Sequence, residues 1–360
     1  MIVLFNKLCL GLLRLYDFMV FSKLIKRFVF SVPIISIGNI VIGGTGKTPF
    51  VQYLSQALKK HNITSVIVSR GYKKNSGGTY VVHNGSQRIC DSPYICGDEP
   101  FMLASKPGCV PIVVDNKKTR GIAFAIQKFK PQVVLLDDSF QSRYIKKNFD
   151  IVLFNTLNTK QDLNFFPFGK LRDNIASLQN ASLVVFTKNN LSSVNSSGVD
   201  YILPIIKKYG VPYLYSNTST SLIKYILNKK EKLTWSAPSQ VFSMPKQQRL
   251  FSFCGIGDPN SFTKTTNTYQ NSVVVHANFS DHYNYYKHEK QFLQTLRSLY
   301  DQHDITGILT THKDFVKIQN LSAGFLDWCH RVRLNFFVLE IELQVNNEDF
   351  IIRKIKNLGL

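Results

Sequence analysis

The stretch "VPIISIGNIVIGGTGKTP", Val32 to Pro49, decides the fold of this chain. It begins as a short, β-rich apolar run and continues into a glycine-rich loop. Pro49 lies just inside the start of the next segment, where the missing N–H group of proline costs a helix nothing. That segment, "TPFVQYLSQALKKH", carries a helical apolar stripe formed by Val51, Leu54, Ala57 and Leu58. The sequence therefore predicts the order strand, loop, helix.

The loop inside this stretch has the end of a phosphate-binding pattern. Its glycines let backbone N–H groups curl round phosphates at the helix N-terminus, where Lys47 would reach the β- and γ-phosphates and Thr48 would hold Mg²⁺. The full pattern, G-x-x-x-x-G-K-[ST], has a further glycine where this chain has Val41. A plain glycine turn between a strand and a helix is the alternative. The predicted cofactor-binding residues are Gly43, Gly44, Thr45, Gly46, Lys47 and Thr48.

Three further apolar runs predict strands in the same domain. "TSVIVSRGY" follows the helix, "QVVLLDDSFQSR" contains Asp137 and Asp138 at its end, and "DIVLFN" comes next. An apolar strand followed by Asp is typical of a carboxylate directed at Mg²⁺ beside the phosphate loop, although ordinary turns also begin this way. The alternation of strands with helical segments predicts an α/β fold, a P-loop NTPase-like doubly wound parallel sheet.

Size and charge limit the remaining possibilities. With 360 residues, two domains are more plausible than one, and 44% hydrophobic and 12% aromatic residues are typical of folded globular proteins. The net charge of +21 is spread along the whole chain and predicts an anionic partner, while no RNP, zinc-finger or basic-zipper pattern favours nucleic acid. The six cysteines include no C-x-x-C pair, so neither a zinc site nor a disulfide framework is indicated, and a reducing cytosol fits best.

Residues 1–30 predict an N-terminal helix that contacts a membrane surface. Charged residues interrupt every apolar run before the ~18 residues that a spanning helix needs, and no secretory cleavage site follows a charged head. Asn6, Lys7, Arg14 and Asp17 fall on one helical stripe and leave a wide apolar face of leucine and aromatic residues. A basic flank suited to anionic lipid follows at Lys23, Lys26 and Arg27. A helix packed on the core of the protein is the alternative.

A phosphate-binding loop alone does not separate a kinase from a GTPase or a motor, so the other polar clusters matter. "ICGDEPFMLA" places Asp98 and Glu99 before a helical run, where acids also serve as ordinary helix-capping groups. "FSDHYNY" places Asp281 and His282 among aromatic residues. "FFPFGKLRD" and "LTTHKDFVKI" add polar turns, the first after a proline and the second after a strand. Each cluster alone is compatible with ordinary loop chemistry.

Taken in order, these motifs resemble one family, the lipid A 4'-kinases of Gram-negative bacteria, also called tetraacyldisaccharide 4'-kinases. The resemblance rests on "VPIISIGNIVIGGTGKTP", "SRGY", "GDEP", the Arg120 context in "VVDNKKTRG", "LLDDSFQSR", "LRD", "FCGIGDPNSF", "FSDHYNY" and "TTHKD", together with the apolar, basic N-terminus. It covers most of residues 1–318. The loop of the family resembles GN-x-x-x-GGTGKTP and does without the first glycine, which accounts for Val41.

The resemblance implies a reaction, its cofactors and its partners. ATP, with Mg²⁺, donates its γ-phosphate to the 4'-hydroxyl of tetraacyldisaccharide 1-phosphate, which gives lipid IVA. The partners are this glycolipid and the anionic surface of the bacterial inner membrane at its cytoplasmic face, with no nucleic acid. Asp98 matches the proposed catalytic base, His282 matches its partner from the second domain, and Arg172 matches a basic position near the γ-phosphate. The positions near metal and phosphate are matched by Thr48, Asp137, Asp138 and Gln141.

The same resemblance implies the domain organisation. We expect an amphipathic membrane-associated helix at 1–30, a P-loop nucleotide-binding domain at 31–205, a two-stranded linker at 206–248 and a smaller α/β domain at 249–360. Asp173, His312 and Ser139 stand where the family usually has Glu, Glu and Gly. A rival is a membrane-associated regulatory ATPase with a deviant Walker loop, but Ile42 replaces its signature lysine. A nucleic-acid-binding ATPase is supported only by the charge.

Overall fold

The computed structural model describes residues 2–22, 24, 26–71, 74, 77–191, 197–229, 233–235, 239–241, 248–269 and 272–360. Tyr72 of the "SRGY" motif and Lys23 of the basic flank lie outside the described residues. The chain forms two compact units. The first contains residues 1–91, 95–218 and 343–360, and the second contains residues 92–94 and 219–342.

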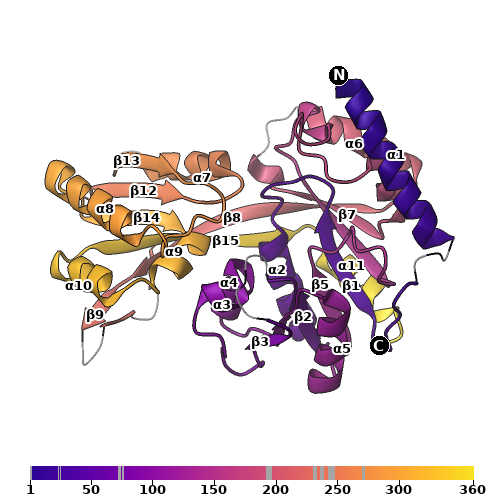
Figure 1. Ribbon diagram of the computed structural model, residues 1–360, viewed down its shortest axis with the longest axis horizontal. Coiled ribbons are helices and arrows are strands. Elements are labelled where there is room, and N and C mark those ends of the chain that lie inside the picture. The colour runs from indigo at the N-terminus through magenta and orange to yellow at the C-terminus, as the bar shows by residue number, and fades with distance from the viewer. Residues whose placement is uncertain are drawn as a thin grey trace. The chain divides into compact units, whose positions relative to one another are not determined.

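The first unit is built on a mostly parallel sheet with the strand order β8-β7-β6-β1-β5-β2-β4-β3 (Figure 1). Its strands are β1 Ile34–Asn39, β2 Ser65–Ser69, β3 Tyr80–His83, β4 Ile112–Val114, β5 Val133–Asp137, β6 Phe149–Asn155, β7 Leu183–Thr187 and β8 Tyr213–Tyr225. Only β3 pairs antiparallel within this order, with β4. The sequence patterns did not indicate β3 and β4, because strands of four and three residues are too short for a clear periodicity.

The burial of the central strands explains why the sequence predicted them as apolar runs. β1 pairs in parallel with β5 on one side and with β6 on the other. Every residue of β1, β2 and β5 is buried, as expected for parallel strands covered on both faces, so these strands appear as continuous apolar runs. The chain goes from β1 through α2 to one side of the sheet and from β5 to the other side at β6, so the ends of β1 and β5 meet at a topological switch point.

Helices flank the strands of the first unit. They are α2 Lys47–Lys60, α4 Asp98–Ala104, α5 Lys118–Phe129, α6 Ser197–Lys208 and α11 Glu348–Lys356, with 3₁₀ turns at Gln161–Leu163, Ile175–Asn180 and Asn189–Leu191. The short helix α3 Pro93–Cys96 begins in the second unit and ends in the first. α2 begins one residue after Gly46, whose φ of 80° is left-handed and therefore suits glycine. The last helix returns to this unit, with Glu348 Oε1 3.9 Å from Nε2 of His61.

The N-terminal helix, α1 Ile2–Phe21, packs on the first unit through two polar residues and part of its apolar surface. Asn6 Nδ2 donates to Asn164 Oδ1 at 3.0 Å, and Asp17 pairs with Arg143. Apolar residues of the same helix contact the core cluster that includes Ile202 and Ile206 of α6, namely Phe5, Cys9, Leu10 and Leu13. The outward residues Leu8, Leu12, Leu15 and Phe18 are 56% to 64% exposed. Within the described residues, no helix has the length and apolarity needed to cross a membrane.

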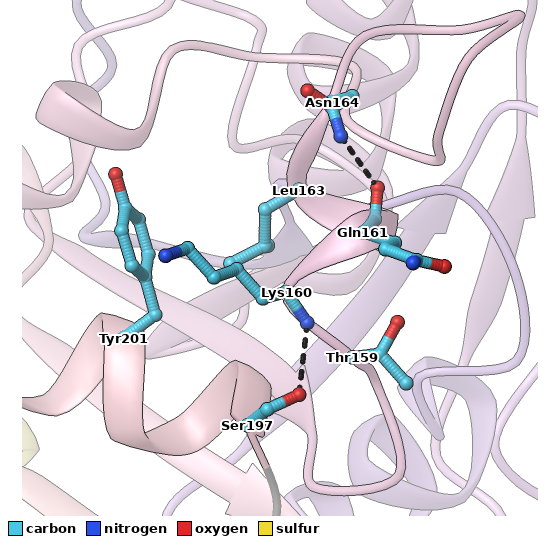
Figure 2. Close-up of a pocket in the computed structure, with 7 residues that line it drawn as sticks. All are labelled: Thr159, Lys160, Gln161, Leu163, Asn164, Ser197 and Tyr201. Atoms are coloured by element: carbon cyan, nitrogen blue, oxygen red, sulfur yellow. Dashed lines mark hydrogen bonds between the residues drawn. The ribbon is translucent and has the colours of Figure 1, made fainter.

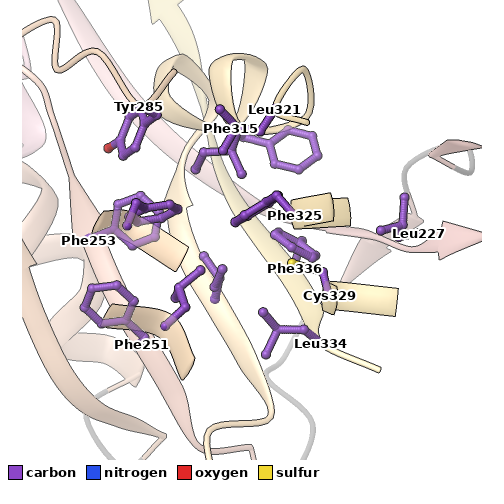
Figure 3. Packing of buried hydrophobic residues seen from close by; sticks show 14 of the residues in the cluster. Leu227, Phe251, Phe253, Tyr285, Phe315, Leu321, Phe325, Cys329, Leu334 and Phe336 are labelled. Carbon is purple, nitrogen blue, oxygen red and sulfur yellow. The ribbon is translucent and has the colours of Figure 1, made fainter. Parts of the chain in front are cut away.

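The second unit has its own parallel strands and an aromatic core. Its strands are β9 Leu227–Lys229, β10 Leu233–Trp235, β11 Ser239–Val241, β12 Leu250–Cys254, β13 Val273–Asn278, β14 Gly307–Thr311 and β15 Asn335–Val345. Its helices are α7 Pro259–Thr266, α8 Glu289–His303, α9 His312–Ile318 and α10 Ala323–Arg331, with a 3₁₀ turn at Asn267–Tyr269. β12 lies between β13 and β14, parallel to both, and β15 follows β14 in parallel. Figure 3 shows Phe251, Phe253, Phe325 and Phe336 within the buried cluster of this unit.

Two strands, β8 and β15, contribute residues to both units. β8 belongs to the first unit up to Thr218 and to the second from Ser219, and β15 passes back to the first unit at Leu343. The expected linker at 206–248 contains the end of α6 and the whole of β8, while its partner strand β15 lies more than 80 residues further along the chain. The last 18 residues, 343–360, belong to the first unit and not to the smaller one.

Candidate active site

The glycine loop lies at the carboxyl end of β1 and is tied to the ends of neighbouring strands. Thr45 is buried, and its hydroxyl accepts a hydrogen bond from Asn39 Nδ2 at 2.9 Å. The carbonyl of Thr45 accepts from Thr187 Oγ1 at the end of β7, at 3.0 Å. Gly43 and Gly46 have φ angles of 115° and 80°, which ordinary residues avoid. The loop is therefore held in a curled conformation before α2 begins.

Val41 fills the place of the missing glycine as part of the core. Its side chain is buried, and its backbone forms an antiparallel bridge with Leu171. Ile42 N donates to the carbonyl of Lys170 at 2.6 Å, and Arg172 N donates to the carbonyl of Ile40 at 2.9 Å. This pairing brings the "GKLRD" segment alongside the loop. A residue that pairs and packs in this way needs no glycine conformation.

Asp137 ends β5 and Asp138 follows it directly, but the two carboxyl groups have opposite environments. Asp137 is buried and accepts from Ser69 Oγ at 3.1 Å through Oδ2, whereas its buried Oδ1 has no hydrogen-bond partner among the described residues. Burial, with the nearby charges of Glu99 and Asp138, raises the pKa of Asp137. Burial opposes ionisation of Asp138 too, but Lys47 at 3.7 Å and then Arg172 hold the pKa of this carboxyl well below its usual range. Asp138 is therefore a carboxylate, and Asp137 offers a buried oxygen without a donor.

This pair fits a hard cation. Mg²⁺ prefers one or two carboxylates and completes its shell with water and phosphate oxygens. The unpartnered Oδ1 of Asp137 is a ligand of this kind, and Thr48 lies on the first turn of α2, directly after Lys47. Where the structure describes the chain, no group of three or more His, Cys, Asp and Glu side chains could hold a metal. A cation here would thus depend on the nucleotide for part of its coordination.

Asn39 connects the predicted residues, and the sequence motifs did not single it out. It is fully buried at the end of β1, and its amide also donates to the carbonyl of Val41 at 2.5 Å. Its backbone carbonyl accepts from Gln141 Nε2 at 2.7 Å, and its side-chain oxygen accepts from Arg172. The signal available was the "GN" that precedes the loop. Gln141 and Arg172 are thus placed by the same residue that shapes the loop.

Gly38 explains why β1 can approach these residues so closely. A Cβ atom at this position would lie 2.6 Å from Cβ and 2.7 Å from the backbone nitrogen of Phe140. The main chain after the acid pair therefore lies directly against β1. Glycine at this position keeps Gln141 within reach of Asn39.

Asp98 begins α4 in the first unit. Its N-cap is Gly97, with a φ of 95°, and both Asp98 and Glu99 lie in the first turn, where acids stabilise a helix. Two buried thiols lie just before this turn, with Sγ of Cys90 and Sγ of Cys96 2.7 Å apart. The C-x₅-C spacing of this pair is not a recognised motif, so sequence analysis passed over it.

His282 lies in the second unit on a loop that Asp314 organises. Asp314 is fully buried and accepts from Gly255 N at 2.8 Å, from Thr311 Oγ1 at 2.8 Å and from Tyr285 Oη at 3.1 Å. This carboxylate therefore joins the "FCGIGDP", "TTHKD" and "FSDHYNY" motifs. His282 has a left-handed φ of 57°, and its Nε2 lies 3.3 Å from Nζ of Lys313, which would make Nε2 the acceptor in this pair.

The residues predicted from sequence thus fall into two groups. The first unit brings together Lys47, Asp137, Asp138, Gln141 and Arg172 round Asn39. Asp98 belongs to the same unit and His282 to the other, so their partnership stays a prediction. The departures from the family pattern are accommodated locally. Asp173 is buried and pairs with Arg143 at 2.7 Å, and His312 Nδ1 lies 3.8 Å from Oε1 of Glu340.

A separate hollow in the first unit contains none of the predicted site residues. It has a volume of about 720 Å³ and lies between the segment after β6 and the start of α6 (Figure 2). Lys160 Nζ lies 5.4 Å from the ring centroid of Tyr201, and Lys160 N donates to Ser197 Oγ at 3.1 Å. The hollow is lined by Thr159, Lys160, Gln161, Leu163, Asn164, Ser197 and Tyr201.

Comparison with known proteins shows the family to which this chain belongs. The sequence model described as "Tetraacyldisaccharide-1-P 4'-kinase" matches residues 2–358. The chain belongs to this family. The tetraacyldisaccharide 4'-kinase of Desulfotalea psychrophila is 31% identical over 324 residues, which cover 88% of this chain and 87% of that protein. The enzyme of the same name from Rickettsia typhi is 30% identical and covers 89% of this chain and 84% of its own length.

A solved structure confirms the fold class. LpxK from Aquifex aeolicus, whose crystal structure is described as a complex with ATP, is 25% identical, with a TM-score of 0.71 over 99% of this chain and 98% of that one. The α/β fold with a large, mostly parallel sheet is therefore confirmed, as is the predicted resemblance to the tetraacyldisaccharide-1-P 4'-kinases. The regulatory ATPase is not favoured by these matches.

The contacts of Arg172 predict that lysine cannot replace it. Arg172→Lys keeps the charge but loses the planar fork that reaches both Asn39 and Asp138, so kcat for phosphate transfer should fall about tenfold or more. Steady-state kinetics with a thermal melt would measure this effect. The reverse exchange, Lys170→Arg, alters an exposed side chain that pairs with Asp162 and should leave kcat unchanged. A parent-like kcat in Arg172→Lys would show that the charge alone suffices.

Proposed function

We propose that the chain transfers the γ-phosphate of ATP to the 4'-hydroxyl of tetraacyldisaccharide 1-phosphate, the step of lipid A biosynthesis that yields lipid IVA. Membership of the tetraacyldisaccharide-1-P 4'-kinase family over residues 2–358 supports this activity, as do the names of its relatives. The observation that carries the mechanism is the convergence of the glycine loop and the Asp137–Asp138 pair at the end of β1. ATP is the phosphate donor, in keeping with the ATP complex of the similar A. aeolicus protein.

In this proposal the loop is a P-loop that binds the phosphates of ATP. Backbone N–H groups of Gly43 to Thr48 surround the phosphates at the N-terminus of α2, and Lys47 reaches the γ-phosphate. Arg172, part-exposed beside Asp138, adds positive charge where negative charge spreads over the transferred group. Thr48, Asp137 and Asp138 would hold Mg²⁺, which would supply positive charge against the phosphates. Gln141 connects the segment after β5 to the glycine loop, because its side chain donates to the backbone carbonyl of Asn39.

Activation of the acceptor is assigned to Asp98. A sugar hydroxyl is a weak nucleophile, and a carboxylate within hydrogen-bond reach can orient it and accept its proton late in a loose transition state. Asp98 begins α4 beside Glu99, and the charge of Glu99 acts on Asp137, so this turn lies near the metal-binding edge. His282 would hydrogen-bond the acid from the second unit and tune it.

A membrane role for α1 is supported by the distribution of its side chains. Its polar anchors, Asn6 and Asp17, face the protein, while four large apolar residues face outward. A helix of this kind buries its apolar face at the boundary between headgroups and acyl chains. The net charge of +21 favours an anionic surface. We place the protein at the cytoplasmic face of the bacterial inner membrane, where α1 would present the active site to a lipid-anchored acceptor.

Transfer of labelled phosphate from ATP to tetraacyldisaccharide 1-phosphate, followed by thin-layer chromatography, tests the activity directly. The parent protein should give a product labelled at the 4'-position, and ATP turnover should require the glycolipid. Lys47→Ala should abolish transfer without loss of fold, because this lysine serves the γ-phosphate. Lys59→Ala, at the other end of α2, is the matched control. Acceptor-independent turnover would instead indicate a regulatory ATPase.

The outward face of α1 predicts how the protein binds vesicles. The triple variant Leu8→Ser, Leu12→Ser, Leu15→Ser removes exposed apolar surface without touching the inward anchors, so binding to vesicles with anionic lipid should fall about 10²-fold or more. Sedimentation with vesicles measures the bound fraction. The matched control carries Val274→Ser and Ile341→Ser, which alter exposed apolar residues of the second unit. Equal binding by the triple variant and its parent would exclude α1 as the contact.

The proposed pairing of Asp98 with His282 predicts a non-additive kinetic cycle. Asp98→Ala and His282→Ala should each lower kcat by about 10²-fold, the range expected for loss of general-base help, with little change in KM for ATP. The double variant should be hardly worse than the worse single variant, because members of one catalytic unit do not act independently. Asp91→Ala, an exposed acid in the segment before α3, is the control. Losses that multiply would show that the two residues act separately.

A further inference from the structure

Lys118, the first residue of α5, is a buried cation next to the acid pair. The side chain is only 7% exposed. Its Nζ atom donates to the backbone carbonyl of Asp138 at 2.5 Å and to Oγ of Ser139 at 2.6 Å. The hydroxyl of Ser139 donates onward to the carbonyl of Asp137 at 2.7 Å. One amino group therefore connects to the main chain at both acidic residues.

The backbone that Lys118 holds is in a costly conformation. Asp138 has a φ of 46°, in the left-handed region that side-chain-bearing residues rarely adopt. Such a conformation is energetically unfavourable and persists only when several surrounding contacts hold it in place. Lys118 holds the carbonyl of Asp138, while Arg172 and Lys47 attract its carboxylate. The two sets of contacts fix the two ends of the same residue.

Ser139 is part of this arrangement. It stands where the family usually has glycine, and its hydroxyl supplies Lys118 with a second acceptor. The amino group also lies among the charges of Asp137 and Asp138, which favour its ionised form against the burial that lowers its pKa. A cation in this position offsets part of the repulsion between two neighbouring carboxylates.

We infer that Lys118 is a positioning residue for phosphate transfer, which sets the left-handed turn at Asp138 and so directs the carboxylates of Asp137 and Asp138 toward Mg²⁺ and Lys47. This inference rests on the proposed kinase function of the same site. Lys118 does not contact the reacting groups, because its amino group is used by main-chain and hydroxyl oxygens behind the turn. Its effect passes through the geometry of Asp138.

Lys118→Met tests the inference, with Lys117→Met as the matched control. Methionine keeps an unbranched side chain that is one atom shorter and removes the donor, while Lys117 is the exposed neighbour. In Lys118→Met, kcat should fall about 10- to 100-fold, as expected when a catalytic group is misplaced by about 1 Å. The Mg²⁺ requirement, measured as the dissociation constant for Mg²⁺ in the presence of ADP by calorimetry without turnover, should rise several-fold, and KM for ATP should stay within about twofold. Lys117→Met should match the parent in all three quantities.

A purely structural role would lower the melting temperature without changing the Mg²⁺ dependence of the folded enzyme. A parent-like kcat and Mg²⁺ requirement in Lys118→Met would therefore overturn the inference. If parent and Lys117→Met both lack glycolipid-dependent transfer, the proposed function fails instead, so the two failures are distinguishable.

Ser139→Ala keeps the inference testable if Lys118→Met does not fold. It removes one acceptor of Lys118 and leaves the bond to the carbonyl of Asp138. The variant should lose about fivefold in kcat, the value of a single hydrogen bond, with a higher Mg²⁺ requirement. In the Lys118→Met background the same change should add nothing, because the two residues act through one contact. Unchanged kinetics in folded Ser139→Ala would contradict the inference.

Discussion

The hydrogen bonds of Asn39 at the end of β1 are the constraint on which the candidate site depends. The side-chain amide donates to the carbonyl of Val41 and to the hydroxyl of Thr45, and so fixes both ends of the turn into the glycine loop. The oxygens of the same residue accept from Gln141 and Arg172. Because Asn39 is fully buried, leaving any of these groups unpaired would cost about 1–3 kcal/mol. The hydrogen bonds of Asn39 therefore fix the shape of the loop and the positions of Gln141 and Arg172 at the same time.

Charge balance is the second constraint at this edge of the sheet. Two adjacent carboxylates end a fully buried strand, and cations from three different elements compensate them, namely Lys47 of α2, Lys118 of α5 and Arg172 of the segment after β6. The compensation is uneven, because Lys47 and Arg172 stabilise the ionised form of Asp138, while burial and neighbouring acids disfavour the ionised form of Asp137. A divalent cation bound here would complete the balance and would satisfy the unpartnered oxygen of Asp137.

The N-terminal helix combines polar and apolar contacts with the first unit. A helix that serves only the core faces its apolar residues inward, but α1 binds the first unit through Asn6 and Asp17 as well as through part of its apolar surface. Its remaining leucines are exposed, and exposure of apolar side chains to water is energetically unfavourable. The helix therefore packs on the core and also keeps apolar side chains outward, while contact of this outward face with a membrane stays a proposal.

The sequence by itself determined the strand–loop–helix unit, the acid pair at a strand end and the membership of the family, because these are local patterns of apolar periodicity, glycine and charge. β3 and β4 were too short to be recognised in this way. The tertiary structure decided which residues surround the loop. The roles of Asn39, Lys118 and Asp314 depend on hydrogen bonds to partners as far as 133 residues along the chain, and the return of residues 343–360 to the first unit depends on the path of β15. Such contacts do not appear in the periodicity of the sequence. A buried polar side chain needs particular donors and acceptors, and only the folded chain brings these together.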